Sequence, residues 1–254
     1  MIAGTTTREH ISSFIWQHLW LLVSLFVMTM GVALCVRSNL GSSVISTIPY
    51  VLALAGETGD VPALTIGEYT YVMNAVFVAI QVLALRRRFE LVQLFQLVIG
   101  FFFGFLLDLN MELTASLAAF PVCEELPVQA LVQLAGCTVL GIGIAFEVRC
   151  GSVTMPGEGI TIAFSRLTGT PFPRTKIIID TTLVVIAVLL GYVYFGRWLW
   201  DVTGFGTIFA MVYVGAVVKV VNPHLGWFDR VLGYIPGFRR YIYGLARFLY
   251  SSRP

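Results

Sequence analysis

The sequence predicts an all-α, polytopic membrane protein. We expect six transmembrane helices and two short re-entrant half-helices, arranged as two inverted three-helix repeats and followed by a C-terminal amphipathic helix. Three observations predict this fold: a composition too apolar for a soluble domain, six apolar runs long enough to cross a bilayer, and an internal repeat that relates the two halves of the chain.

Composition sets the class of protein. Of the 254 residues, 57% are hydrophobic and only 12% are charged, and the mean hydropathy is +0.86. Soluble domains carry about 25% charged residues. The net charge of +2 is too small to indicate a nucleic-acid partner. The four cysteines have no metal-ligand spacing, and no phosphate-binding loop, His-Glu-x-x-His motif or nucleophile elbow occurs. We therefore expect no enzyme, no metal and no cofactor.

The apolar runs place the transmembrane helices. A helix needs roughly 20 apolar residues to cross a bilayer. Six runs reach that length or come close to it, at about 17–36, 67–85, 91–109, 128–147, 175–195 and 204–221. Two further runs, 43–55 and 157–167, are too short to cross and are typical of re-entrant, interfacial or buried segments.

The basic residues predict the orientation. If the two short runs return to the side that they entered from and the N-terminus is cytoplasmic, most lysines and arginines outside the spans fall inside the cell, including the run 86–88, and the exceptions are Arg37 and Arg197. Such a bias sets the orientation of membrane proteins. We therefore expect a plasma-membrane protein with both termini in the cytoplasm.

An internal repeat supports the same arrangement. The segment 31–37, GVALCVR, resembles 143–149, GIAFEVR, at a separation of 112 positions. Each copy is followed by a Gly/Ser-rich patch, a short apolar run and two long spans, and Asn110 and Asn222 share the same separation. A unit with three crossings reverses its second copy, so Arg37 is expected outside and Arg149 inside.

The repeat divides the chain into five parts. We expect a cytoplasmic N-terminal segment (1–16), membrane repeat 1 (17–110), an extracytoplasmic connector (111–127), membrane repeat 2 (128–222) and a basic aromatic tail (223–254). The tail is too often interrupted by charge to cross, which predicts an interfacial helix on the anionic lipids of the cytoplasmic leaflet.

The two patches predict a binding site between the repeats. Transporters with inverted repeats use discontinuous helices whose N-termini point at the substrate near the midplane. A helix N-terminus offers free N–H donors and a partial positive charge, which favour an anion or a polar oxygen. The residues expected to line or gate the site are Arg37, Asn39, Ser42, Ser43, Thr154, Glu158 and Asp180.

Several of these residues have a structural alternative. Glu158 is either an acid that stabilises a helix terminus or an ion or proton site. Asp180 follows Lys176 by four residues, so the two form either a structural ion pair or a titrating site beside the short helix. Arg37 adjoins the serine patch and is one of only two basic residues expected outside, which indicates a substrate or gating role.

Four residues are expected to support or gate the site. Asn74 can hydrogen-bond between helices or simply contribute to packing. Arg149 is either an interfacial arginine or an anion contact, and Lys176 accompanies Asp180. Thr207 lies in the Gly-Phe-Gly-Thr segment that opens the last span and could give it flexibility.

Short motifs in the second half resemble a known family. Pro156-Gly-Glu-Gly159, Thr168-Gly169, Arg174-Thr-Lys176, Asp180 and Gly204-Phe-Gly-Thr207 are similar to motifs of the YczE/YyaS/YitT group of bacterial multi-pass membrane proteins, and Leu40-Gly-Ser-Ser43 resembles that group's first patch. In place of the Pro-Trp that often follows in the group, the chain has Val44-Ile45. The resemblance implies a bacterial integral membrane protein, with transport as the common expectation.

Together, these patterns predict a transporter or channel-like facilitator for a small polar solute, anionic if the helix N-termini dominate. The alternative is a non-transporting scaffold, regulator, or lipid- or small-molecule-binding protein. The identity of the solute or ion and the oligomeric state, including a homodimer, are left open by the sequence.

Overall fold

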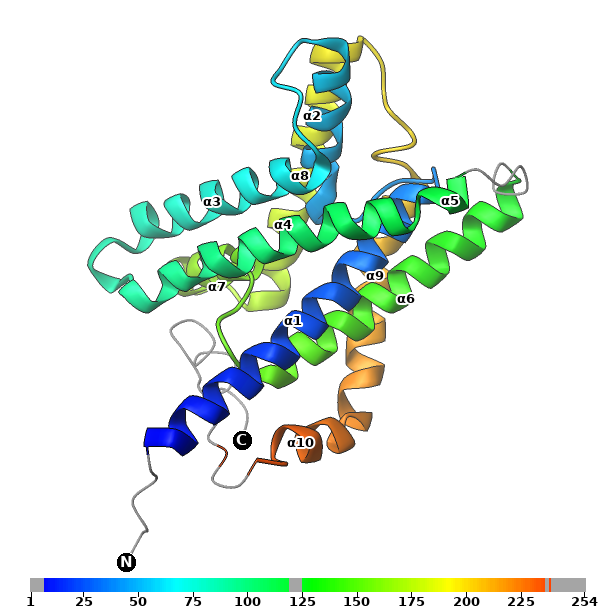
Figure 1. Ribbon diagram of the computed structural model, residues 1–254. Coiled ribbons are helices and arrows are strands. Elements are labelled where there is room, and N and C mark those ends of the chain that lie inside the picture. The colour runs from blue at the N-terminus through cyan, green and yellow to red at the C-terminus, as the bar shows by residue number, and fades with distance from the viewer. Residues whose placement is uncertain (1–6, 119–124, 236–237, 239–254) are drawn as a thin grey trace, which may run out of the picture.

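The computed structural model describes residues 7–118, 125–235 and 238, and within them the protein consists of helices and connecting loops, with no β-strand (Figure 1). The α-helices are α1 (Thr7–Arg37), α2 (Thr47–Thr58), α3 (Ile66–Leu85), α4 (Phe95–Leu113), α5 (Ala115–Ala118), α6 (Leu126–Cys150), α7 (Pro156–Thr168), α8 (Phe172–Phe195), α9 (Phe205–Val221) and α10 (Gly226–Leu232). Short 3-10 helices include η1 (Val44–Ser46), η2 (Arg86–Arg88), η3 (Leu91–Leu94) and η5 (Asn222–His224).

The six predicted spans correspond to six helices long and apolar enough to cross a membrane: Arg8–Arg37, Ile66–Arg88, Leu91–Leu113, Leu126–Cys150, Phe172–Phe195 and Phe205–His224. The all-α polytopic fold class is therefore confirmed. The helices extend beyond the predicted bounds, most of all α1, which begins at Thr7 and takes up much of the segment predicted to precede it. The apolar run does not show this extension because the first turns of α1 contain polar residues. Two of the polar residues in the N-terminal half of α1, Ser13 and Gln17, are buried against the bundle instead of facing solvent.

The bundle has two ends, which we name after two arginines. At the Arg37 end, the Arg37 guanidinium at the C-terminus of α1 donates to the Met111 carbonyl near the C-terminus of α4 (2.7 Å). At the Arg149 end, the Arg149 guanidinium near the C-terminus of α6 donates to the Asn222 side chain just after α9 (2.7 Å) and to the Asn222 carbonyl. Each arginine thus ties the first long helix of its repeat to the last.

The central helix crossing has the symmetry that the repeat predicts. Helices α1 and α6 lie side by side and antiparallel (Figure 1), and they form the most extensive helix pair of the bundle. A Cβ on Gly31 would lie 2.4 Å from the Leu140 nitrogen, and a Cβ on Gly143 would lie 2.7 Å from the Met28 nitrogen. Residues 28 and 140 are 112 positions apart, as are residues 31 and 143. Gly31 on α1 therefore lets α6 approach closely in the same way as Gly143 on α6 lets α1 approach.

The remaining helix pairs follow this symmetry with one departure. Helix α4 packs on α1 as α9 packs on α6, α2 packs on α3 as α7 packs on α8, and α2 contacts α8 as α7 contacts α3. By contrast, α3 packs closely along α4, whereas α8 and α9 have no comparable contact. The outer faces of α8 and α9 expose large apolar side chains such as Val193 and Phe205, as expected of surfaces that face lipid.

The short helices α2 and α7 start in the interior and return to the end from which the chain came. The loop after α2 lies at the Arg37 end, because the Tyr69 hydroxyl on α3 donates to the Pro62 carbonyl (2.5 Å) and Asp108 near the end of α4 accepts from the Gly67 N–H (2.8 Å). Helix α7 leads into Phe172, which packs near Leu85 at the opposite end. The structure thus has the predicted re-entrant path in both halves.

The predicted C-terminal tail lies only partly within the described residues. Helix α10 packs onto the bundle: Phe228 is fully buried in the main apolar cluster, and the Trp16 indole N–H donates to the Val231 carbonyl (3.2 Å). This part of the tail therefore contacts protein instead of lying freely on a lipid surface. The rest of the predicted amphipathic segment, and residues 119–124 of the connector, lie outside the described residues.

Candidate functional site

The N-terminal ends of the two short helices meet inside the bundle, as the repeat predicts. A Cβ on Gly157, in the first turn of α7, would lie 3.0 Å from the Cδ1 of Ile45 in η1. The surrounding side chains are apolar and include Phe77, Ile160 and Leu183. The two N-termini therefore converge, but the space between them is filled by hydrocarbon and not by polar groups.

The loop before α2 (residues 38–43, the first loop) is closed against the start of α9. The Ser42 N–H donates to the Val202 carbonyl (2.9 Å), and the Gly206 N–H donates to the Leu40 carbonyl (2.8 Å). Gly41 has φ +123°, and a Cβ there would lie 2.6 Å from the Thr207 hydroxyl and 2.7 Å from the Gly204 nitrogen. Only glycine fits this conformation and this approach without strain.

A buried glutamine stabilises the same contact between the first loop and the start of α9. Gln133 on α6 accepts a hydrogen bond from the Ser38 hydroxyl (2.7 Å) and donates one to the Gly206 carbonyl (2.8 Å). It thus joins the end of α1 to the start of α9 through α6. The sequence reasoning missed Gln133, although a polar residue in an apolar run is a signal of a buried hydrogen-bonding role.

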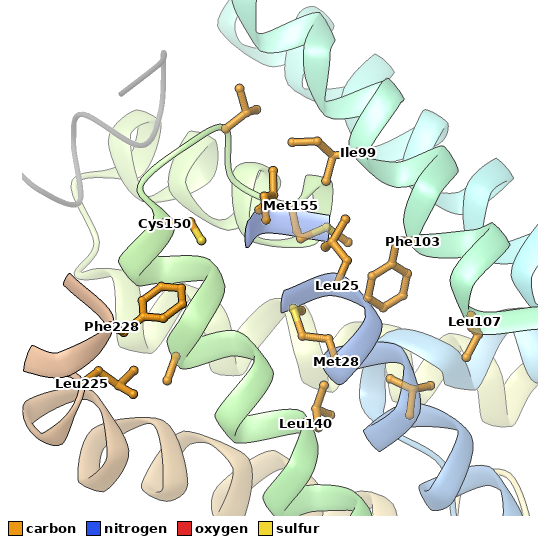
Figure 2. Packing of buried hydrophobic residues seen from close by; sticks show 14 of the residues in the cluster. Leu25, Met28, Ile99, Phe103, Leu107, Leu140, Cys150, Met155, Leu225 and Phe228 are labelled. Atoms are coloured by element: carbon orange, nitrogen blue, oxygen red, sulfur yellow. The ribbon is translucent and has the colours of Figure 1, made fainter. Parts of the chain in front are cut away.

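The loop before α7 (residues 151–155, the second loop) is held from different neighbours. The Met155 N–H donates to Glu147 Oε1 on α6 (3.2 Å), and the Ser152 hydroxyl lies 3.0 Å from His18 Nε2 on α1. The Gln81 side chain on α3 donates to the Pro156 carbonyl (3.3 Å). Figure 2 shows Met155 in the same apolar cluster as Leu25, Ile99 and Phe103.

The two loops differ in how they meet the last long helix of the opposite repeat. At a separation of 112 positions, Gly41, Gly204 and Thr207 correspond to Val153, Val92 and Phe95. The first three are in direct contact, whereas the second three line a pocket of about 340 Å³ together with Phe14 and Leu91. The first loop is therefore in direct contact with the last long helix of the other repeat, whereas a pocket lies beside the second loop.

A second set of buried polar groups surrounds the start of α7. Gln81 on α3 and Gln96 on α4 donate to each other (3.2 and 3.3 Å), and both are fully buried. A Cβ on Gly159 would lie 2.6 Å from Gln96 Oε1, so this glycine lets α7 approach the amide pair. Both glutamines lie in apolar runs, and the sequence reasoning passed over them.

Glu147 is the acidic residue that the sequence reasoning left out of the site. Its side chain is 4% exposed; one carboxyl oxygen accepts the Met155 N–H, and the other, Oε2, has no hydrogen-bond partner in the structure. The Thr154 hydroxyl beside it is also buried and without a partner. The signal was present, because an acid inside an apolar run marks a functional position by default.

The predicted binding residues at the first loop do not face an interior site. Arg37 donates to the Met111 carbonyl, and Asn39 is exposed in a left-handed conformation (φ +57°). Ser42 bonds to the Val202 carbonyl, and the Ser43 hydroxyl pairs with Ser46 (2.8 Å). Of these four residues, Ser42 contributes to the closure of the first loop.

The predicted residues of the second half lie nearer to one another. Thr154 is in the second loop, and Glu158, half-buried in the first turn of α7, interacts electrostatically with Glu147, Lys176 and Asp180. Lys176 Nζ and Asp180 Oδ1 form an ion pair of 2.7 Å. The acids and the lysine of this half therefore belong to one electrostatic cluster.

The three remaining predicted residues have structural positions. Thr207 donates to the Val202 carbonyl (3.2 Å) and packs against the first loop. Asn74 is fully buried next to Gly100 and its amide makes no hydrogen bond, which favours the packing alternative over a hydrogen bond between helices. Arg149 forms an ion pair with Asp229 on α10 in addition to its contacts with Asn222.

These features define an α-helical membrane protein built from two inverted halves, each with a broken helix in the interior. The chain belongs to a family of unknown function (DUF6198), whose match covers residues 15–223, from the first turns of α1 to η5. No curated protein and no solved structure matches the chain. The family match does not confirm the resemblance to the YczE/YyaS/YitT group, which stays a prediction.

Proposed function

We propose that the protein is a membrane transporter or channel-like facilitator for a small polar solute, and that it works by opening and closing its two loops in turn. The observation that carries the proposal is the difference between them. The first loop is sealed by Gly41 against Gly204 and Thr207, while the corresponding Val153, Val92 and Phe95 line an open pocket.

The proposal also has a physical basis. Loops without helical structure inside a membrane are energetically unfavourable, so we expect them to serve a function. Non-helical backbone within a membrane is tolerated where it is buried in protein or lines a cavity. Inverted repeats allow the two halves to exchange conformations, so that the arrangement of one half becomes that of the other. In this view the structure corresponds to a state that is open at the Arg149 end, the predicted cytoplasmic side.

Within the small polar solutes that the sequence predicts, the site favours neutral or cationic ones over the anionic alternative. Arg37 and Arg149 bind carbonyl groups or an aspartate at the two ends of the bundle. The interior cluster next to the second loop contains Glu147, and Glu158 in the first turn of α7. A neutral or cationic polar solute suits these acids better than an anion. The resemblance to the YczE/YyaS/YitT group, for which transport is the common expectation, supports the same function.

Two cysteine pairs in a cysteine-free background test the proposal. The pair Ser42→Cys with Val202→Cys reports closure of the first loop, and the pair Val153→Cys with Val92→Cys reports closure of the second. Alternating closure predicts that each pair cross-links under mild oxidation, and that locking the first loop abolishes cross-linking of the second. Purified protein in lipid vesicles is the sample, and gel mobility is the readout.

Two outcomes would contradict the proposal. A second-loop pair that never cross-links would mean that the pocket is a fixed feature of a non-transporting protein. Cross-linking of both pairs in one molecule would show that the loops close independently, which contradicts exchange between the halves.

A lipid-binding protein is the second candidate, because the pocket at the second loop is apolar. Its lining includes Phe14, Phe95 and Val153, which would suit an acyl chain. Co-purified lipid that is lost on Val153→Trp, in a protein whose second loop never closes, would favour this candidate over transport.

A further inference from the structure

The carboxyl group of Glu147 is buried in a way that a purely structural acid would not need. The residue is 4% exposed, and Met155, whose N–H it binds, belongs with Leu25 to the main apolar cluster (Figure 2). Oε1 accepts the Met155 N–H at 3.2 Å, and Oε2 has no partner. An ionised carboxylate that is buried without a counter-charge is strongly disfavoured.

The charged groups near Glu147 do not neutralise it. Glu158, in the first turn of α7, repels a negative charge on it. Lys176 on α8 is already paired with Asp180, and Arg149 on the same helix as Glu147 is paired with Asp229 on α10. His18 on α1 is directed to Ser152, and α3 and α4 contribute the neutral amides of Gln81 and Gln96. A proton on Oε2 is the remaining means of neutralising the carboxyl group.

One feature favours the ionised form as soon as water reaches the site. The Met155 N–H that binds Oε1 belongs to the residue that precedes α7, where the helix dipole favours a negative charge. The carboxyl group is thus held between burial, which favours its protonated form, and a helix N-terminus, which favours its ionised form. A movement of the second loop changes that balance because the loop carries the N–H donor.

We propose that Glu147 is a proton-binding residue, protonated on Oε2 while the second loop encloses it and deprotonated when the loop moves. When the loop moves, the proton passes from Oε2 to water that reaches the carboxyl group. The Thr154 hydroxyl, which is buried and without a partner, lies within the same loop and gives that water a polar group to bind. Proton binding stands by itself; only its use to drive solute movement rests on the proposed function.

Infrared difference spectroscopy of the full chain in lipid vesicles tests proton binding directly. A pH titration should give a carbonyl band of a protonated carboxylic acid that shifts in D2O. Glu147→Gln should lose this band, whereas Glu158→Gln and the exposed Glu57→Gln should keep it. If Glu147→Gln fails to fold, Glu147→Asp serves in its place and should give the band at a shifted position.

Two results would overturn the proposal: no such band in the unaltered protein over the pH range in which it stays folded, or a band that is lost in Glu158→Gln and kept in Glu147→Gln. The loop cross-link gives a separate measurement. Cross-linking of Val153→Cys with Val92→Cys should depend on pH with Glu147 present and become independent of pH in Glu147→Gln. A band that is lost in Glu147→Gln, together with a loop that never closes, would uphold the proton site and refute transport.

Discussion

Gly31→Ala is the sharpest perturbation of the inverted crossing between α1 and α6. The added Cβ would lie 2.4 Å from the Leu140 nitrogen and 2.7 Å from the Gly136 oxygen, both backbone atoms that cannot rotate away. The first distance is 1.0 Å short of the 3.4 Å at which ordinary van der Waals contact begins. The two helices must therefore separate, and a gap of this size forfeits a quarter to a half of each contact across the seam.

Overpacking of this kind costs about 1–3 kcal/mol. The matched control is Gly215→Ala on α9, where an added Cβ meets nothing within 4 Å. Removing a helical glycine there should stabilise the protein by about 0.5–1 kcal/mol. The repeat further predicts that Gly143→Ala, which meets the Met28 nitrogen at 2.7 Å, destabilises the protein about as much as Gly31→Ala.

Chemical denaturation in detergent micelles measures the free energy of unfolding of the three variants. The expected order is Gly215→Ala above the unaltered protein, with Gly31→Ala and Gly143→Ala below it by similar amounts. If Gly31→Ala were as stable as Gly215→Ala, the close crossing would be wrong, and with it the symmetry that depends on it.

Three further predictions concern the two ends of the bundle. Gly41→Ala should loosen the first loop, because φ is +123° and Thr207 is too close; we expect faster thiol labelling of a cysteine at position 42, with exposed Gly59→Ala as the control. Gln133→Leu removes two buried hydrogen bonds, one from the Ser38 hydroxyl and one to the Gly206 carbonyl, and should cost about 1–3 kcal/mol of unfolding free energy in the same denaturation assay. Arg149→Ala removes the partly exposed ion pair with Asp229; we expect at most about 1 kcal/mol from the pair itself and faster proteolysis of the tail, whereas exposed Arg87→Ala should change neither.

The sequence could predict the helices because run length and hydropathy depend only on local composition. The repeat also carried real information about tertiary structure: Gly31 and Gly143 were the first residues of its two copies, and they form the symmetric crossing. Arg37 and Arg149, the last residues of the same copies, make equivalent contacts with the ends of α4 and α9. Positions related by the repeat were thus predictable as pairs.

What those residues contact could not be predicted in the same way. The direction of the Arg37 side chain depends on how α1 is rotated relative to α4, and an internal repeat does not determine this rotation. The guanidinium, which was expected to contact the substrate, donates to a backbone carbonyl instead. The repeat also implies that the two loops are equivalent, yet Gly41 and Val153 differ in size and the loops differ in closure. Glu147 received no role from the sequence because burial of its carboxyl group depends on how the second loop folds over α6, which no local pattern shows.

Side-specific labelling of single cysteines tests the central claim, that two re-entrant halves are inverted in a membrane. Four exposed positions suit it: Asn39 and Thr58 flank the first re-entrant segment at the Arg37 end, and Arg87 and Leu167 lie at the Arg149 end. In sealed vesicles of uniform orientation, an impermeant thiol reagent should label Asn39→Cys and Thr58→Cys from one side and Arg87→Cys and Leu167→Cys from the other. Labelling of Asn39→Cys and Thr58→Cys from opposite sides would mean that α2 crosses the membrane, and the account of two inverted, re-entrant halves would be contradicted.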